Sequence, residues 1–156
     1  MKKLILNILF ITFCTCVYSQ APDEQKFFGT WKWKNGNKEL ILFMKYDTVK
    51  KVTSIPLIIG FHRYIRNDSV VQDYMPLYLP EYASSGEASF GGLLDNNNSN
   101  VFIGSIFDKE MNKNGRLYLT FIYPNKLKFE LMSMNAPQGK GAGFSLPTGI
   151  ILTKQP

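Results

Sequence analysis

Apolar residues recur mostly at every second position from Phe27 onward, and this alternation constrains the fold more than any other feature of the chain. In segment 126–132, the apolar Leu127, Phe129 and Leu131 alternate with the charged Lys128 and Glu130. A period of two is typical of strands with one buried and one solvent-facing side. The 3.6-residue period of an amphipathic helix is almost absent. The sequence therefore predicts an all-β protein with antiparallel strands.

Turn-forming residues interrupt the alternation roughly every 8 to 15 residues, as sequential hairpins require. Segments 116–123 and 126–132 are separated only by Pro124-Asn125, which predicts a hairpin. Asn35-Gly36 favours a type I′ turn between two further strand-like segments. Strands are expected over 28–34, 38–46, 57–66, 70–72, 87–94, 101–107, 116–123, 126–132 and 149–153.

The number and order of these segments predict a closed, lipocalin-like, up-and-down barrel of about eight to ten antiparallel strands. Closure is favoured because it removes the exposed strand edges that an open sheet must protect. A two-sheet β-sandwich is the alternative. Gly91-Gly92, inside a strand-like segment, predicts a bulge or a sharply bent corner. A short helix is expected over 23–26.

The N-terminus has the order of a secretory signal peptide: Lys2 and Lys3, an apolar run over 4–13 and a short polar exit at 18–20. The apolar run is shorter than the 18 or so residues that a membrane span needs. We therefore predict a signal peptide over 1–20, a single β-barrel domain over 21–156, a secreted or periplasmic location, and no membrane span after cleavage. The less favoured alternative is a lipoprotein acylated at Cys16.

Charge and cysteine content exclude several classes of function. Removal of two lysines leaves 18 − 2 = 16 basic residues against 12 acidic ones, a mature net charge of +4. The lysines are scattered, so the sequence predicts no nucleic-acid partner. Both cysteines, Cys14 and Cys16, lie in the segment to be removed, so the mature chain has no disulfide and no thiolate ligand.

No motif for catalysis, a metal or a cofactor stands out, and we predict none of the three. His62 is the single histidine, so no histidine cluster can bind a metal. Asp108 with Glu110 is a conceivable carboxylate pair but belongs to no recognisable motif. The glycine-rich run 139–143 lacks the ending of a phosphate loop. Alternation within 57–66 predicts that Leu57, Ile59, Phe61, Arg63 and Ile65 face inward and that His62 faces outward.

Aromatic residues and one arginine are the candidate ligand-binding residues. Alternation from Phe27 places Trp31 and Trp33 inside the barrel. Arg63, predicted to face inward, would be a cation among apolar side chains and would require an acid, an aromatic face or a ligand. Three tyrosines lie on a segment that its prolines keep out of regular structure. The predicted ligand-binding residues are Trp33, Arg63, Tyr74, Tyr78 and Tyr82.

Two resemblances add to this interpretation. Gly29-Thr30-Trp31 on the first strand resembles the opening motif of lipocalins and related calycin barrels. In those proteins the tryptophan closes one barrel end, often against an arginine of the last strand. The resemblance implies this role for Trp31; the last strand here offers Lys154, and Arg63 is the candidate substitute for the arginine.

The second resemblance extends over the whole mature chain. The sequence Gly29-Thr30-Trp31-Lys32-Trp33, the segment 59–65 and the segment 148–152 together resemble a family of small secreted bacterial proteins of unknown function. We expect a small apolar or amphipathic ligand in the barrel lumen. The alternative is an envelope or secreted protein-interaction module whose barrel is filled by side chains.

Overall fold

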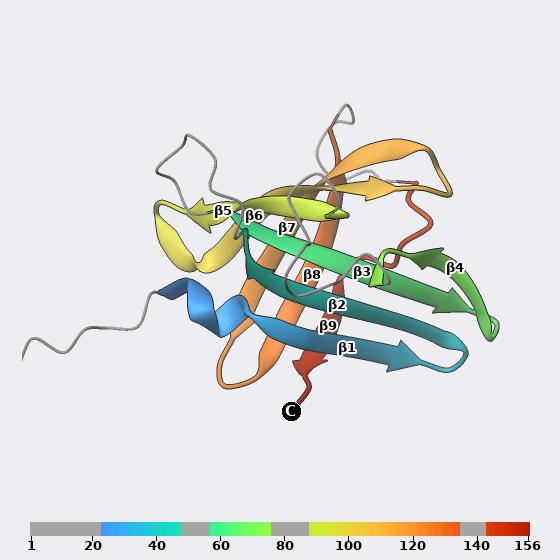
Figure 1. The fold of residues 1–156 in the computed structure, drawn as a ribbon, viewed down its shortest axis with the longest axis horizontal. Coiled ribbons are helices and arrows are strands. Elements are labelled where there is room, and N and C mark those ends of the chain that lie inside the picture. Colours follow the sequence, from blue (N-terminus) through green and yellow to red (C-terminus); the bar gives the residue numbers. More distant parts are fainter. Residues whose placement is uncertain (1–22, 48–56, 76–87, 135–142) are drawn as a thin grey trace, which may run out of the picture.

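The computed structural model describes residues 23–47, 57–75, 88–134 and 143–156 (Figure 1). Residues 1–22, on which the signal-peptide prediction rests, lie outside these ranges. A 3₁₀ helix and nine strands form the described part: η1 (Asp23–Phe27), β1 (Gly29–Asn35), β2 (Lys38–Tyr46), β3 (Ile58–Arg66), β4 (Ser69–Asp73), β5 (Phe90–Asp95), β6 (Asn98–Asp108), β7 (Lys113–Ile122), β8 (Lys126–Ser133) and β9 (Ile150–Lys154). Within these ranges no helix is both long and apolar enough to cross a membrane.

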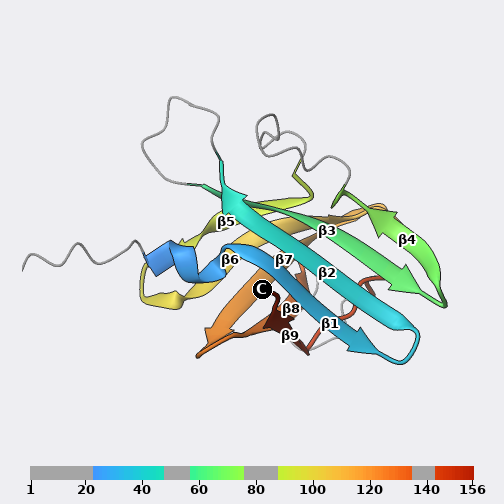
Figure 2. The same ribbon diagram turned by 60° about the horizontal axis from the view of Figure 1, so that its bottom comes forward.

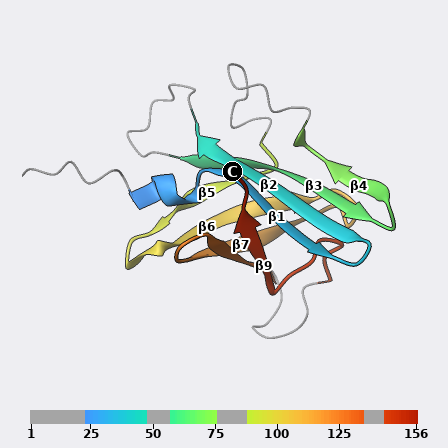
Figure 3. The ribbon, with the colours of Figure 1, turned by 90° about the horizontal axis from the view of Figure 1, so that it is seen from below.

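Eight of the strands close into an antiparallel up-and-down barrel. The hydrogen-bonded order is β2-β1-β9-β8-β7-β6-β5-β3, and a further pairing of β2 with β3 completes the ring. The extra strand, β4, pairs with β3 beyond the point where β5 stops (Figure 2). Seen from below, β4 lies at one end of the barrel (Figure 3). The predicted barrel is confirmed, and the sandwich alternative is not observed.

Turn chemistry explains why neighbouring strands pair. Gly36, between β1 and β2, has a φ of 57°, and Asn67 and Asp68, between β3 and β4, have φ values of 54° and 58°. These left-handed conformations are those of tight hairpin turns, which glycine, asparagine and aspartate tolerate best. The predicted β7–β8 hairpin is confirmed, with Ile122 opposite Lys126.

Of the two features predicted at Gly91-Gly92, a bulge or a sharply bent corner, the bulge is not present. Both glycines pair in regular register with β6, Gly91 with Ser105 and Gly92 with Gly104. The register shift in this strand pair lies further on, between Leu94 and Asp95.

The barrel interior is occupied by one continuous cluster of packed side chains. All eight barrel strands contribute buried residues to it, and Phe27 of η1 and Leu146 contribute from outside the strands. Its buried members include Trp31, Leu40, Leu42, Met44, Ile58, Tyr64, Phe90, Phe102, Ile106, Leu117, Leu119, Leu127, Phe129, Leu131 and Leu152. Trp31 has no exposed surface, as predicted.

The faces of β3 are the reverse of those predicted. The β2 register places Leu42 opposite His62 and Met44 opposite Gly60, and directly opposed residues share one face of a sheet. Because Leu42 and Met44 belong to the interior cluster, His62 faces inward and Arg63 faces outward. The prediction failed because the outer face of β3 is also apolar and covered, so apolarity alone did not distinguish the two faces.

Candidate functional site

A second apolar cluster lies on the outer wall of the barrel, over β3. Ile59 and Phe61 are its buried centre, and partly buried neighbours pack around them: Phe43, Leu57, Tyr74, Met75 and Ala88. Most antiparallel strands of a barrel present a polar face to solvent. An apolar outer face on β3 therefore marks this part of the wall as unusual.

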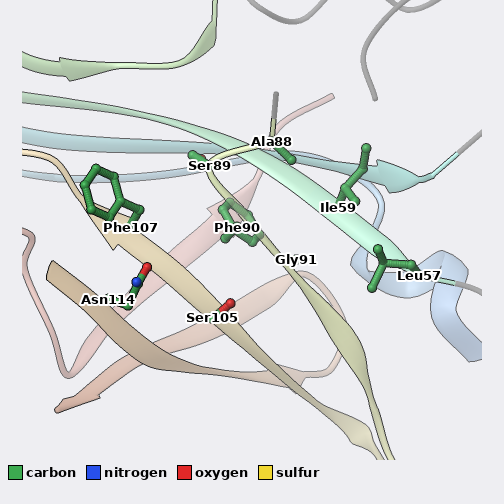
Figure 4. A pocket seen from close by; sticks show the side chains of 9 residues that line it. All are labelled: Leu57, Ile59, Ala88, Ser89, Phe90, Gly91, Ser105, Phe107 and Asn114. Atoms are coloured by element: carbon green, nitrogen blue, oxygen red, sulfur yellow. The ribbon is translucent and has the colours of Figure 1, made fainter. Parts of the chain in front are cut away.

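A pocket of about 340 Å³ opens beside this cluster, where β3, β5 and β6 run side by side (Figure 4). Its lining residues are Leu57, Ile59, Ala88, Ser89, Phe90, Gly91, Ser105, Phe107 and Asn114. Pockets of roughly 300–1,000 Å³ with mostly apolar walls and a few polar groups are the usual sites for small molecules. This pocket lies at the lower end of that range.

Gly91 leaves the space that the pocket occupies. It stands between Ile59 of β3 and Ser105 of β6 in the same cross-strand row. A Cβ atom at this position would meet only Ile58 O at 3.6 Å and Ile59 Cγ2 at 3.7 Å, which are ordinary contact distances. A side chain there would therefore fit the backbone and fill the pocket.

The polarity of the pocket changes from β3 toward β7. Leu57 and Ile59 form the apolar side, whereas Ser105 and Asn114 line the opposite side with a hydroxyl and an amide (Figure 4). Asn114 stands directly opposite Phe107 in the β6–β7 register. The pocket thus suits a molecule with an apolar body and one polar end.

Beneath the pocket, a buried polar network surrounds His62. Its Nε2 lies 3.1 Å from Gln72 Oε1, and its Nδ1 lies 2.8 Å from Ser89 Oγ. Gln72 Oε1 also accepts a hydrogen bond from the backbone N–H of Lys109, so the amide oxygen faces the histidine. His62 therefore carries its proton on Nε2 and accepts the Ser89 hydroxyl proton at Nδ1. Burial lowers the pKa of His62 to about 4, against the opposing effects of Gln72, Asp108 and Asp73.

Asp108 is the buried anion of this network. It accepts hydrogen bonds from Gln72 Nε2 (2.8 Å), Ser145 Oγ (2.6 Å), Ser145 N (2.7 Å), Met111 N (3.2 Å) and Leu146 N (3.4 Å). Burial alone would raise the pKa of Asp108, but the donors from Ser145, Met111 and Leu146 outweigh it and lower that pKa. The carboxylate therefore fastens β4, the β6–β7 turn and the segment before β9 to one barrel end.

Ser89 and His62 have the spacing of a nucleophile and its general base. Both are buried, at 5% and 0% exposure, and the Ser89 hydroxyl also lies 3.3 Å from Gly60 O. A histidine with a pKa near 4 is a weak base at neutral pH. The arrangement is better suited to holding β3, β4 and β5 together than to activating a hydroxyl.

The three predicted ligand-binding residues that the structure describes do not share one face of the barrel wall. Trp33 packs against the interior cluster. Arg63 is on the outer face, where its Nη2 lies 2.9 Å from Asp73 Oδ2, so its predicted inward orientation is wrong. Tyr74 packs on the outer cluster, with its ring centroid 4.9 Å from that of His62. Tyr78 and Tyr82 lie outside the described residues.

The pocket and the polar network were both missed by the sequence analysis. Gly91 was predicted to mark a bulge or a sharply bent corner, and not to border a pocket. Asp108 follows Phe102 and Ile106 in the alternation of its strand and could have signalled the network, whereas Gln72 shares its alternation with the exposed Val70 and gave no such signal. In the part of the chain that the structure describes, no group of three or more His, Cys, Asp or Glu residues is placed to hold a metal ion.

Comparison with known proteins gives a family and no assigned activity. No curated protein and no solved structure is a match for this chain. A family model described as a family of unknown function, DUF6705, matches residues 1–155, nearly the whole sequence. This small barrel with a filled interior and a pocket in its outer wall therefore belongs to the DUF6705 family of unknown function.

Proposed function

We propose that this protein binds a small apolar or amphipathic molecule in the pocket on the outer wall of its barrel. The observation that carries the proposal is the pocket itself: about 340 Å³, apolar toward β3, and lined by Ser105 and Asn114 at its other side. The room for a Cβ atom at Gly91 supports the same interpretation, because a side chain there would make only ordinary contacts and would extend into the site.

The lumen is the less suitable place for a ligand. Trp31, Phe102, Phe129 and their neighbours meet inside the barrel and are almost completely buried against one another. A ligand there would have to displace packed side chains, whereas the described residues that line the outer pocket leave space for a ligand without rearrangement. Eight-stranded barrels are wide enough either to be filled or to hold one ligand, and the packing here favours the first case.

We further propose that the role is binding without catalysis, and that the protein acts outside the cytoplasm. The first statement rests on the buried, hydrogen-bonded state of His62 and its pKa near 4. The second rests on the signal-peptide pattern of the first twenty residues. The filled interior also suits the alternative, an interaction module that accepts a side chain of an envelope protein in the same pocket.

Binding of a neutral probe to matched variants tests the proposal. We expect 1-octanol to bind wild-type protein saturably, as measured by isothermal titration calorimetry. Gly91→Val should weaken binding at least tenfold, because the valine fills the pocket. Thr120→Val, which also places a valine on the outer wall but on β7 and outside the pocket lining, is the control and should bind like wild type. Absence of saturable binding to wild type, or equal binding by Gly91→Val, would contradict the proposal and favour the interaction module.

A further inference from the structure

An exposed cation, Arg116, lies on β7 beside the polar side of the pocket. In the β5–β6 register Gly91 lies opposite Ser105, and in the β6–β7 register Ser105 lies opposite Arg116. Directly opposed residues of antiparallel strands have Cβ atoms about 5 Å apart and share a face. The Arg116 side chain therefore starts next to the Ser105 hydroxyl on the outer wall and is long enough to reach the pocket opening.

Among the residues that the structure describes, no neighbour neutralises the positive charge of Arg116. The residues beside it on the same face are Ser105 and Met132 across the strands, and Asn114 and Tyr118 along β7, none of which is charged. Glu130 is diagonal to it, but its carboxylate lies 2.9 Å from Lys128 Nζ. No ion pair within the described ranges involves Arg116.

The side chains along this cross-strand row change from apolar to polar to charged. It runs from apolar Ile59, over the empty space at Gly91, to the Ser105 hydroxyl and finally to the Arg116 guanidinium. A guanidinium binds a carboxylate through two parallel hydrogen bonds, and hydroxyl and amide groups next to it add further donors. The row is therefore complementary to a molecule with an apolar chain and a terminal carboxylate.

We propose that the ligand of the outer pocket is an amphipathic carboxylate, with its chain against Leu57 and Ile59 and its acid group at Arg116, Ser105 and Asn114. This inference rests on the proposed function and adds the chemical class of the ligand. At about 30 Å³ for each water-sized group, the pocket has room for about ten non-hydrogen atoms. Octanoate is a probe of this size and chemistry.

The experiment compares octanoate with 1-octanol, which has the same chain length and no charge. Both are titrated by calorimetry into wild type, Arg116→Gln and Lys34→Gln at low ionic strength. Lys34 is the charge-matched control, because it is exposed on β1, four strands from β6 around the ring. We expect wild type to bind octanoate about tenfold more tightly than octanol, and Arg116→Gln to remove that preference without changing octanol binding. Lys34→Gln should retain the preference.

The other possible results separate a failure of the carboxylate inference from a failure of the proposed function. Equal binding of the two probes by wild type, or an octanoate preference that survives in Arg116→Gln, overturns the carboxylate inference while the pocket stays a binding site. Loss of the preference in Lys34→Gln as well shows a general effect of net charge and also overturns the inference. If wild type binds neither probe, the proposed function itself fails. A folding defect is recognised by thermal unfolding of each variant, and Arg116→Lys then replaces Arg116→Gln, with a reduced preference expected.

Discussion

The Nζ atom of Lys154 lies 5.4 Å from the centroid of the Trp31 ring, so that a cation of the last strand covers the buried tryptophan of the first. The two residues are register partners in the β1–β9 pair that helps to close the barrel. Trp31 also donates its Nε1–H to Phe27 O at 2.8 Å, which ties η1 to the same end. A cation over an indole ring is favourable by about 0.5–2 kcal/mol.

Trp31→Ala should lower the free energy of unfolding by about 3–5 kcal/mol, the usual cost of deleting a large core aromatic. Lys154→Met, which keeps the apolar stem and removes the charge, should cost only about 1 kcal/mol. Urea unfolding followed by circular dichroism measures both. A loss below about 1 kcal/mol for Trp31→Ala would show that Trp31 does not anchor the barrel end.

The closed barrel could be predicted from alternation and turn residues. The side chain that covers Trp31 at the barrel end could not. Alternation placed Trp31 correctly inside the barrel. The cation facing it is Lys154, however, whereas Arg63 had been the predicted substitute. That error came from β3, which has apolar residues on both faces. Its outer residues Ile59 and Phe61 can be apolar because neighbouring side chains, including Tyr74, cover them. Register with β2, which alternation within one strand does not reveal, decides its orientation.

Stability should fall as the pH is lowered from about 6.5 to about 4, because of His62. The folded-state pKa of His62 is lowered to about 4 by burial, while the unfolded chain binds the proton near 6.5. Between these values only the unfolded state is protonated, so each pH unit removes about 1.4 kcal/mol, or about 3 kcal/mol in total. Urea unfolding at pH 4 to 8 measures this loss.

The assignment is testable because His62 is the only histidine in the chain. His62→Gln should be less stable at pH 7 but should lose the slope between pH 6.5 and about 4.5. A further fall in stability below pH 4 is expected in both proteins, because the pKa of Asp108 is lowered by its hydrogen bonds and its stabilising effect disappears on protonation. A flat wild-type profile between pH 6.5 and 4 would contradict the buried neutral histidine.

Asp108→Asn should destabilise the protein by about 3 kcal/mol or more. The amide would present a donor to backbone N–H groups of Ser145 and Leu146 that now donate to the carboxylate, leaving buried donors unpaired. Glu110→Gln is the control, since Glu110 pairs with Arg66 at the surface and its loss should leave the free energy of unfolding almost unchanged. Similar losses in the two variants would show that the Asp108 network is not a main support of the fold.

Adjacent glycines of β5 should respond differently to substitution. At Gly92 a Cβ would lie 2.1 Å from Ile103 O, a backbone atom that cannot move away, so Gly92→Ala should cost on the order of 2 kcal/mol or more. Gly91→Ala should change stability by less than about 1 kcal/mol, because its Cβ meets only ordinary contacts. Thermal unfolding of both variants measures the contrast. Equal losses would show that the space above Gly91 is not available.

The candidate site was less predictable than the fold for a physical reason. The pocket depends on which residues of β3, β5, β6 and β7 lie side by side, and Ile59, Gly91, Ser105 and Arg116 come from four separate parts of the chain. Cross-strand register is set by long-range pairing and packing, which local patterns do not specify. The sequence identified an amphipathic binder as a hypothesis but placed its ligand in the lumen.

The location of the ligand is the central claim, and mapping of amide chemical shifts tests it most directly. In a ¹⁵N–¹H correlation spectrum titrated with octanoate, we expect the largest changes at Gly91, Ser105 and Asn114, and small changes at the interior residues Leu42 and Leu119. Changes concentrated at the interior residues would place the ligand in the lumen and contradict the account. No saturable change at any of these amides would contradict it as well.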